Sequence, residues 1–310
     1  MKFLIAVAGP TAIGKTKVSI ALARYYNSEI ISADARQLYR EMNIGTAKPL
    51  HNELNSITHH FINHCSIHQA YSAGDFEKEA LLKINYLFES HDVLVITGGS
   101  GLFMRAVLQG LNEFPSVNKQ VQHRLDDILK SQGIIALQNL LRDYDPKYYE
   151  SADLNNPRRL LRALSVSISS GKPYSSFKTN DVQPRNFQVI KIGLYLDRNI
   201  LYHRINNRVD QMMQDGFLQE AQNLKPFAHL NALQTVGYQE LFDHLDGKLT
   251  LPEAVNLIKQ HSRNYAKRQL TWLRKEKDIT WFHPDQIQEM IVFVEESRLK
   301  GKIIEGSMTH

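Results

Sequence analysis

The sequence is poor in the features that mark secreted, metal-stapled and membrane-spanning proteins. Cys65 is the only cysteine among 310 residues, which excludes an intramolecular disulfide and a cysteine-rich metal site. No apolar stretch approaches the roughly 20 residues that a membrane-spanning helix needs. The apolar run of residues 3–8 is also shorter than a signal-peptide core of roughly 7–15 residues. These absences predict a cytoplasmic protein with no membrane partner.

The composition is otherwise that of an ordinary globular protein with a basic excess. Hydrophobic residues make up 43% and charged residues 22% of a chain that is long enough for one large domain or two. The net charge of +5 favours a polyanionic partner, but it does not distinguish RNA, DNA and a membrane surface.

One stretch matches the phosphate-binding pattern G-x-x-x-x-G-K-[ST] at every fixed position. It follows the apolar run of residues 3–8 and precedes an amphipathic helical pattern, which is the context that the pattern requires. Its glycines let backbone N–H groups converge on phosphate oxygens, Lys15 adds positive charge, and the Thr16 hydroxyl suits Mg²⁺. The predicted phosphate-binding residues are Gly9, Pro10, Thr11, Ala12, Ile13, Gly14, Lys15 and Thr16. Taken alone, the loop favours a nucleoside triphosphate such as ATP.

Apolar runs rich in β-branched residues recur along the chain, with helical patterns between them. They cover residues 3–8, 29–33, 92–97 and 189–196. Continuous apolarity is typical of parallel strands that are covered on both faces, so the predicted fold class is α/β, with helices flanking a parallel sheet. Ligands of such sheets bind at the carboxyl ends of the strands, where residues 9–16, 32–34 and 97–101 lie.

The strand pattern is interrupted in the middle of the chain. Residues 117–144 predict a helical hairpin that turns at residues 131–133, ending in Gly133, and a second helix begins with Asn156 as N-cap and Pro157 at its first position. That helix is expected to end at Gly171. Further helices are expected over about residues 231–246 and 252–276. The predicted division is a core segment, an all-helical insertion and a second core segment with basic C-terminal helices, over residues 1–114, 115–185 and 186–310.

Two polar side chains follow predicted strands beside the phosphate loop. Asp34 is a candidate general base or outer-sphere magnesium ligand, and equally a simple turn residue. Ser100 lies among the glycines of residues 98–101, which allow a backbone to approach a ligand closely. A plain strand-to-helix turn is the alternative for this segment.

Basic residues cluster on two predicted helices. The first cluster is Arg158, Arg159 and Arg162, and the second is Lys259, Arg263, Lys267, Arg268, Arg274, Lys275 and Lys277. The second contains one acid, Glu276, and its first three members are spaced by four residues, so they are expected on one helical face. Such a surface favours the phosphate backbone of a nucleic acid, whereas a solvated helix face is the alternative.

Two further clusters allow more than one interpretation. Arg204 and Arg208 are spaced by four residues and either clamp a diphosphate or lie on the surface. Four histidines surround Cys65, but their spacing fits no standard zinc site, and a zinc centre is not expected. They are His59, His60, His64 and His68.

Seven segments match the motifs of one known family in order and spacing, from about residue 3 to residue 282. They are residues 9–16, 31–40, 43–49, 98–103, 159–164, 236–238 and 266–274. By these segments the sequence resembles the tRNA dimethylallyltransferase family, in its compact bacterial form. The phosphate loop is generic, but its combination with Asp34, Gln37, residues 44–49 and residues 266–274 is specific.

The resemblance implies a P-loop NTPase-like core and a defined transfer reaction. Dimethylallyl diphosphate would bind on the phosphate loop with Mg²⁺. The N6 amine of adenosine 37, beside the anticodon of a tRNA, would attack its C1 carbon and release diphosphate. The target adenine would be flipped into a channel, and the enzyme is expected to act as a monomer.

The resemblance also implies residue roles. Asp34 would be the general base, Ser100 would replace the usual threonine near the reacting centre, and Arg208 would join the phosphate loop in binding diphosphate. Thr16 would bind the metal. The insertion would grip the anticodon stem-loop. The implied tRNA-binding residues are Asp34, Ala35, Arg36, Gln37, Gln122, Arg158, Arg159, Arg162, Gln234, Gly237, Tyr238, Gln239, Lys267 and Arg268.

Two other functions would use the same loop. A P-loop small-molecule kinase would transfer phosphate from ATP to a hydroxyl, but Gly98 follows the strand of residues 92–97 where an aspartate is expected. A nucleotide-gated RNA-binding switch would need a guanine-reading motif, and residues 118–121 lack the aspartate of that motif.

Overall fold

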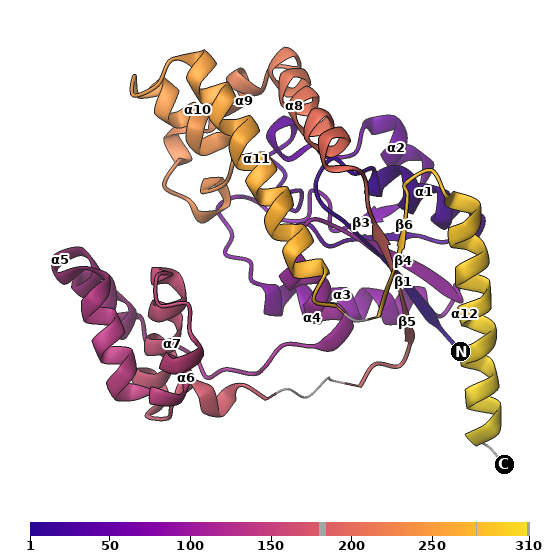
Figure 1. Cartoon of the computed structure of the whole chain (residues 1–310), viewed down its shortest axis with the longest axis horizontal. Coiled ribbons are helices and arrows are strands. Elements are labelled where there is room, and N and C mark those ends of the chain that lie inside the picture. The colour runs from indigo at the N-terminus through magenta and orange to yellow at the C-terminus, as the bar shows by residue number, and fades with distance from the viewer. Residues whose placement is uncertain (180–183, 277, 309–310) are drawn as a thin grey trace. The chain divides into compact units, whose positions relative to one another are not determined.

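A single parallel sheet of six strands organises the larger part of the molecule (Figure 1). The computed structural model describes residues 1–179, 184–276 and 278–308, with side chains up to residue 301. The sheet order is β3-β2-β4-β1-β5-β6, and every described pair of neighbours is parallel. The strands are β1 (Phe3–Ala8), β2 (Ile30–Ser32), β3 (His59–His60), β4 (Val93–Thr97), β5 (Gln188–Leu194) and β6 (Ile279–Phe282). The predicted α/β fold class is confirmed.

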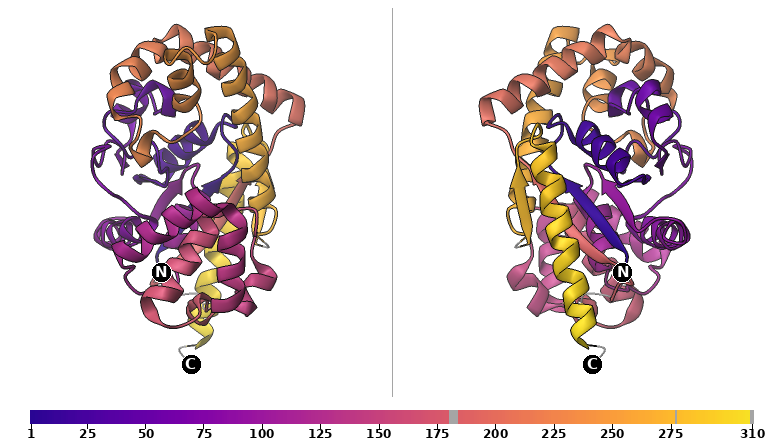
Figure 2. Two further views of the ribbon diagram at one scale, coloured as in Figure 1. Left: turned by 90° about the vertical axis from the view of Figure 1, so that its left-hand side faces the viewer. Right: turned by 90° about the vertical axis from the view of Figure 1, so that its right-hand side faces the viewer.

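Helices cover both faces of this sheet because its strands are apolar on both sides. Phe3, Ile5 and Val7 of β1 pack in one buried cluster, and Leu4 and Ala6 pack in another. The helices of this part are α1 (Lys15–Tyr25), α2 (His51–Ser56), α3 (Ala73–Leu87), α4 (Gly101–Gln109), α8 (Arg198–Gln214), α9 (Phe217–Leu224), α10 (Tyr238–Leu245), α11 (Leu251–Leu273) and α12 (Ile287–Met308). Helix α12 contacts α1 and β5, and its course beside β1 is visible in Figure 2.

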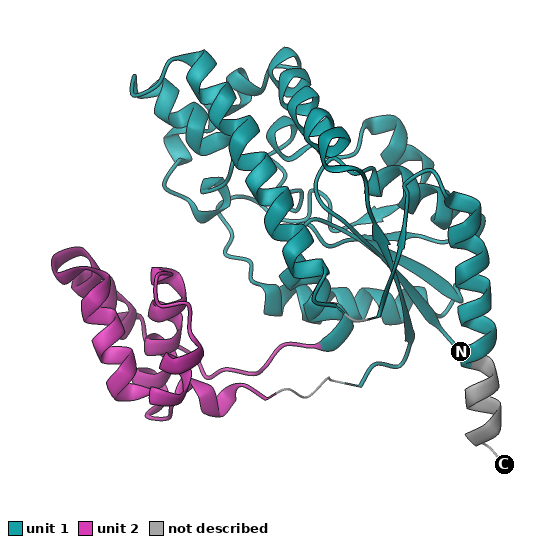
Figure 3. Cartoon of the chain, viewed as in Figure 1, with its two compact units in different colours: residues 1–109, 184–310 teal, residues 110–183 magenta. Residues whose placement is uncertain are grey.

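The chain divides into two compact units (Figure 3). Unit 1 contains residues 1–109 and 184–310, and unit 2 contains residues 110–183. Unit 2 is built from α5 (Lys119–Tyr144), α6 (Pro146–Ser151) and α7 (Pro157–Ser170). Its own buried core is formed by Leu125, Leu137, Leu141, Leu160, Ala163 and Leu164.

Local signals set the shape of unit 2. Gly133 interrupts α5 with a φ of 76°, a left-handed value that glycine adopts without steric cost, so the chain reverses there. The Asn156 side chain accepts a hydrogen bond from the Arg159 N–H, and Pro157 opens α7. The cap and the start of α7 are those that the sequence predicts.

Three local features differ from the sequence prediction. Strands β3 and β6 were not predicted, because β3 has two residues and β6 is a four-residue edge strand. The helix expected from residue 231 begins only at Tyr238, after a 3-10 turn at Asn231–Leu233. Further 3-10 turns lie at Ile44–Thr46, Tyr174–Phe177 and Lys225–Phe227.

No helix in the described part of the chain is long and apolar enough to cross a membrane. Lys277, in the predicted basic cluster, lies outside the described residues.

Candidate active site

The phosphate loop connects β1 to α1 at the carboxyl edge of the sheet. The ammonium of Lys15 donates hydrogen bonds to the backbone oxygens of Gly9, at 3.0 Å, and Pro10, at 2.8 Å. Burial lowers the pKa of Lys15 to about 8, against the raising effect of Asp34, while Arg208 lowers it further. The loop therefore holds a lysine whose charge depends on its neighbours near neutral pH.

Asp34 lies two residues after the end of β2 and is fixed by the protein backbone. Its Oδ1 accepts hydrogen bonds from the N–H groups of Arg36 at 2.9 Å and Gln37 at 3.3 Å. Its Oδ2 accepts a hydrogen bond from the Gly99 N–H at 3.3 Å. Three backbone donors orient the carboxylate, which is the arrangement expected of a group that has to meet a substrate in one position.

The loop after β4 depends on a close backbone approach at Gly98. A Cβ atom there would lie 2.0 Å from the backbone oxygen of Ala33, so any side chain would force the ends of β2 and β4 apart. Two residues further on, the Ser100 hydroxyl accepts a hydrogen bond from the Ala35 N–H at 2.8 Å. The two candidate catalytic segments are therefore joined by direct contacts.

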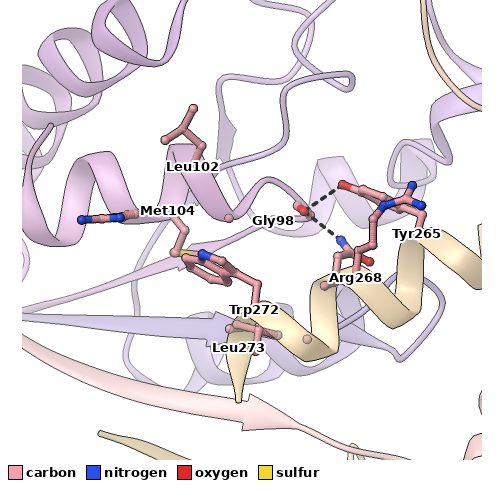
Figure 4. Close-up of a pocket in the computed structure, with 13 residues that line it drawn as sticks. Gly98, Leu102, Met104, Tyr265, Arg268, Trp272 and Leu273 are labelled. Carbon is pink, nitrogen blue, oxygen red and sulfur yellow. Dashed lines mark hydrogen bonds between the residues drawn. The ribbon is translucent and has the colours of Figure 1, made fainter. Parts of the chain in front are cut away.

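Two side chains of α11 close the other side of this loop. Gln269 donates to the Gly99 oxygen at 2.8 Å and accepts from the Thr11 N–H at 2.9 Å, so it ties the phosphate loop to the glycine loop. The Tyr265 hydroxyl donates to the same Gly99 oxygen at 3.0 Å (Figure 4). Burial raises the pKa of Tyr265 to about 12, and Asp34 adds to the rise, so this donor stays protonated.

Neither α11 residue was assigned a role in this site from the sequence. Tyr265 and Gln269 are four residues apart, so they share one face of α11. That spacing was the available signal, but it does not reveal which loop the face meets.

One cleft of about 800 Å³ brings most of the predicted diphosphate-binding residues together with Asp34, but Gly9, Pro10 and Ser100 do not line it. It is lined by Thr11, Lys15, Thr16, Asp34 and Arg208, among others. Ser100 lines a neighbouring cavity of about 310 Å³. Asp34 and Arg208 line this cavity as well as the larger cleft. The structure thus places a phosphate loop, a fixed carboxylate and a hydroxyl around one concave region.

Arg208 reaches this cleft from α8. Among the described residues it has no hydrogen-bond or ion-pair partner. Crowding by protein atoms lowers the pKa of its guanidinium, which Glu53 opposes, but arginine remains charged in proteins. An unpaired guanidinium beside a phosphate loop is suited to bind an anion. Arg204, its sequence neighbour on α8, instead donates to the Ile13 oxygen at 3.3 Å.

Several residues with an implied tRNA contact serve the protein itself. Arg36 donates to the backbone oxygens of Asn231 and Ala232, and Gln37 donates to those of Thr46 and Ala47. These bonds shape the loops around the cleft.

Gly237 and Tyr238, which the resemblance implies as tRNA contacts, are both buried, and Gly237 lines the cavity that contains Asp34 and Ser100. The Tyr238 hydroxyl donates to Glu220 at 2.6 Å. The side chain of Tyr238 is a core residue that supports the segment, since a fully covered phenol presents no surface to RNA. Of the same segment, Gln239 is exposed and Gln234 is half-buried.

Some of the basic residues expected on α11 bond to α8, and others are exposed to solvent. Lys259 pairs with Asp210 at 2.6 Å, and Arg263 donates to Asn206 at 2.6 Å, so both fasten α11 to α8. Lys267 and Arg268 are exposed. In unit 2, the candidate tRNA-binding residues Gln122, Arg158, Arg159 and Arg162 are exposed as well.

The histidines around Cys65 have separate partners. His60 pairs with Glu29 at 2.5 Å and His64 pairs with Glu79 at 2.6 Å. Within the described ranges no group of three or more histidine, cysteine, aspartate or glutamate side chains is arranged to hold a metal ion.

A parallel sheet with a phosphate loop after its first strand defines the class of this protein, which has a P-loop NTPase-like core. The family model for IPP transferase matches residues 37–276. The chain belongs to the IPP transferase family, and the resemblance found in the sequence is confirmed.

Named relatives and solved structures agree with this assignment. The tRNA dimethylallyltransferase of Christiangramia forsetii is 50% identical over 297 residues, which cover 96% of this chain and 98% of that protein. The one from Flavobacterium johnsoniae is 48% identical, over 98% and 100% of the two chains.

Among solved structures, the tRNA isopentenylpyrophosphate transferase of Bacillus halodurans has a TM-score of 0.74 and 35% identity, over 99% of this chain and 100% of that one. A eukaryotic dimethylallyltransferase acting on tRNA has a TM-score of 0.78 and 25% identity, over 99% of this chain and 80% of that one. These relatives support the transferase interpretation, and none of them supports the kinase.

Proposed function

We propose that this chain transfers the dimethylallyl group from dimethylallyl diphosphate to N6 of adenosine 37, next to the anticodon of a tRNA. The observation that carries the proposal is the cleft that Asp34 shares with the phosphate loop and Arg208. A phosphate site beside a fixed carboxylate suits a reaction in which diphosphate leaves while the acceptor loses a proton. The names of the relatives supply the substrate class.

The leaving diphosphate would bind at residues 9–16. The N–H groups at the start of α1, Lys15 and Arg208 supply positive potential where negative charge grows on the leaving oxygen. Lys15 would reach phosphate oxygens by exchanging its hydrogen bonds to the Gly9 and Pro10 carbonyls.

Thr16 is the residue that would hold Mg²⁺. Its hydroxyl is at the start of α1 and lines the same cleft as Asp34, and Mg²⁺ prefers such hard oxygen ligands together with phosphate oxygens. When bound, the ion would neutralise charge on the diphosphate. The residues present therefore fit this cofactor.

The acceptor adenine would be positioned by Asp34 and Ser100. The N6 nitrogen forms the new bond to C1, the bond between C1 and the diphosphate oxygen breaks, and the N6 proton goes to the Asp34 carboxylate. The Ser100 oxygen already accepts from the Ala35 N–H, which leaves its own hydrogen to donate towards the substrate.

The tRNA would be held through its phosphates by exposed polar and basic residues on both units. They are Gln122, Arg158, Arg159 and Arg162 of unit 2, and Lys267 and Arg268 of α11. Ala35, Gln234 and Gln239 are proposed as nearer contacts, while Arg36 and Gln37 would act by shaping their loops. All proposed reacting groups belong to unit 1 of one chain, which supports action as a monomer, and the proposed compartment is the cytoplasm.

A label-transfer assay tests the proposal. The protein is incubated with labelled dimethylallyl diphosphate, Mg²⁺ and unmodified tRNA, without ATP. We expect label to appear in the tRNA. A preparation that transfers no label but consumes ATP with a small-molecule acceptor would overturn the proposal in favour of a kinase.

A further inference from the structure

A second cleft lies in unit 1 between α4 and α11 (Figure 4), and of the residues assigned to the proposed reaction it is lined by Gly9 of the phosphate loop and Arg268. Its volume is about 320 Å³. Gly98, Gly99, Tyr265 and Gln269 line both this cleft and the larger one. Asp34, Ser100, Lys15 and Arg208 do not line it. The bonds of Tyr265 and Gln269 to Gly99 therefore form a wall between the two adjoining clefts.

The walls of this α4–α11 cleft include an aromatic platform. The Trp272 ring rests on the backbone of Gly101, where a Cβ atom would lie 3.1 Å from the ring, so the glycine allows the indole to lie close. Trp272 is half-buried, and its indole N–H has no partner among the described residues. On α4, Leu102 leaves 58% of its surface exposed. A planar apolar ligand with a hydrogen-bond acceptor would stack on the Trp272 ring, accept from its N–H and cover the exposed Leu102 side chain.

The charge at this cleft has one sign. Arg105 of α4 and Arg268 of α11 are the two charged residues that line it, and no lining residue is acidic. Both are exposed, and within the described part of the chain neither forms an ion pair. Arg268 lies over the Tyr265 ring, with 5.8 Å between the guanidinium carbon and the ring centroid. An aromatic floor with a cationic rim is the arrangement that binds single-stranded nucleic acid, by base stacking and phosphate contacts.

Resting on the proposed function, we propose that the α4–α11 cleft binds the base of a nucleotide directly adjacent to the acceptor adenosine. Trp272 is the stacking platform, and Arg105 and Arg268 contact the phosphates on either side. When an adenine is flipped out of its stack, its neighbour loses a stacking partner, and an enzyme that supplies a substitute lowers the cost of flipping. The position of Gly99 fits this role, because this residue lines the α4–α11 cleft while its N–H donates to the Asp34 carboxylate.

The isoprenoid chain is a less suitable occupant of the same cleft. Its C1 carbon is bonded to the diphosphate, which is assigned to the compartment of Lys15 and Arg208 on the other side of the wall. Two guanidinium groups would also gain nothing from a hydrocarbon, whereas they complement phosphates.

Binding of an anticodon stem-loop to two Trp272 variants tests the proposal. We expect Trp272→Ala to weaken RNA binding about ten- to a hundredfold, the range for a lost stacked base, and Trp272→Phe to restore most of it. The KM for dimethylallyl diphosphate should stay unchanged. Arg24→Ala is the control, because it removes an exposed charge from α1 at a residue that lines neither cleft.

An abasic stem-loop makes the test specific to one base. Each of the two bases beside adenosine 37 is removed in a separate stem-loop. With the stem-loop that lacks the stacked base, Trp272→Ala should cause no additional loss of binding, because the two changes remove the same contact. Additive losses, or a raised KM for dimethylallyl diphosphate with unchanged RNA affinity, would overturn the proposal. If the wild-type protein bound RNA with this pattern but transferred no label, the proposed function would fail while the base site stood.

Discussion

At the scale of single residues, the three backbone N–H groups around Asp34 determine what a change there should do. Asp34→Asn keeps the size of the side chain but offers an amide N–H to a backbone donor and no longer accepts a proton. We expect transfer to fall by about 10²–10⁴-fold, the contribution of a general base, while tRNA binding changes little. Single-turnover transfer and a separate binding titration measure both. Lost binding with residual transfer would show that Asp34 is a docking residue.

Lys15 gives the site a pH dependence of its own. Because burial places its pKa at about 8, the free protein loses this charge as the pH rises through that value. Bound diphosphate favours the charged form, so binding takes up a proton and diphosphate affinity should fall above about pH 8. Calorimetric titrations from neutral to alkaline pH measure the fall. In Lys15→Gln only the titration of diphosphate itself remains, and an identical profile for both proteins would contradict this role.

The residues that the sequence could identify are those with a local signature. Lys15 and Thr16 belong to a continuous motif, and Asp34 directly follows a strand, so all three were predicted to lie at one sheet edge. Gln269 bonds Thr11 across 258 positions of sequence, and nothing near either residue encodes that pairing. The burial of Tyr238 likewise depends on Glu220 and Phe217, which reach it from another helix.

At the scale of elements, local chemistry predicted the boundaries that it controls. The cap of α7 and the break at Gly133 were predicted because a side-chain acceptor and a left-handed glycine act within a few residues. The buried runs of β1 and β4 were predicted because both faces are covered. Strands β3 and β6 form at the edges of the sheet, where pairing with β2 and β5 decides their existence.

The N-cap of α7 allows a prediction for unit 2. Asn156→Ala removes the acceptor for the Arg159 N–H and should lower the free energy of unfolding of this unit by about 1 kcal/mol. Asn156→Asp keeps an acceptor and should leave stability nearly unchanged. Denaturant unfolding of the full chain, followed by hydrogen exchange at α7, measures the difference. Equal stability of the alanine and wild-type proteins would show that the cap contributes nothing.

At the scale of the whole molecule, the basic residues should set how salt affects RNA binding. Replacing both Lys267 and Arg268 by alanine removes two proposed phosphate contacts and should reduce the slope of log affinity against log salt by roughly 1.5. The defect should therefore be larger at low salt than at high salt. Lys259→Ala is the matched control, since Lys259 is already paired with Asp210. A defect that does not vary with salt would indicate damage to the fold instead.

The central claim is that one cleft joins a diphosphate site to Asp34, the general base that accepts the N6 proton of adenosine 37. The most direct measurement is nucleoside mass analysis of an anticodon stem-loop after reaction with dimethylallyl diphosphate and Mg²⁺, with released diphosphate counted in parallel. We predict one N6-dimethylallyladenosine at position 37 for each diphosphate released, and no product when guanosine replaces that adenosine. A stem-loop that stays unmodified, or that gains mass at another position, would contradict the account.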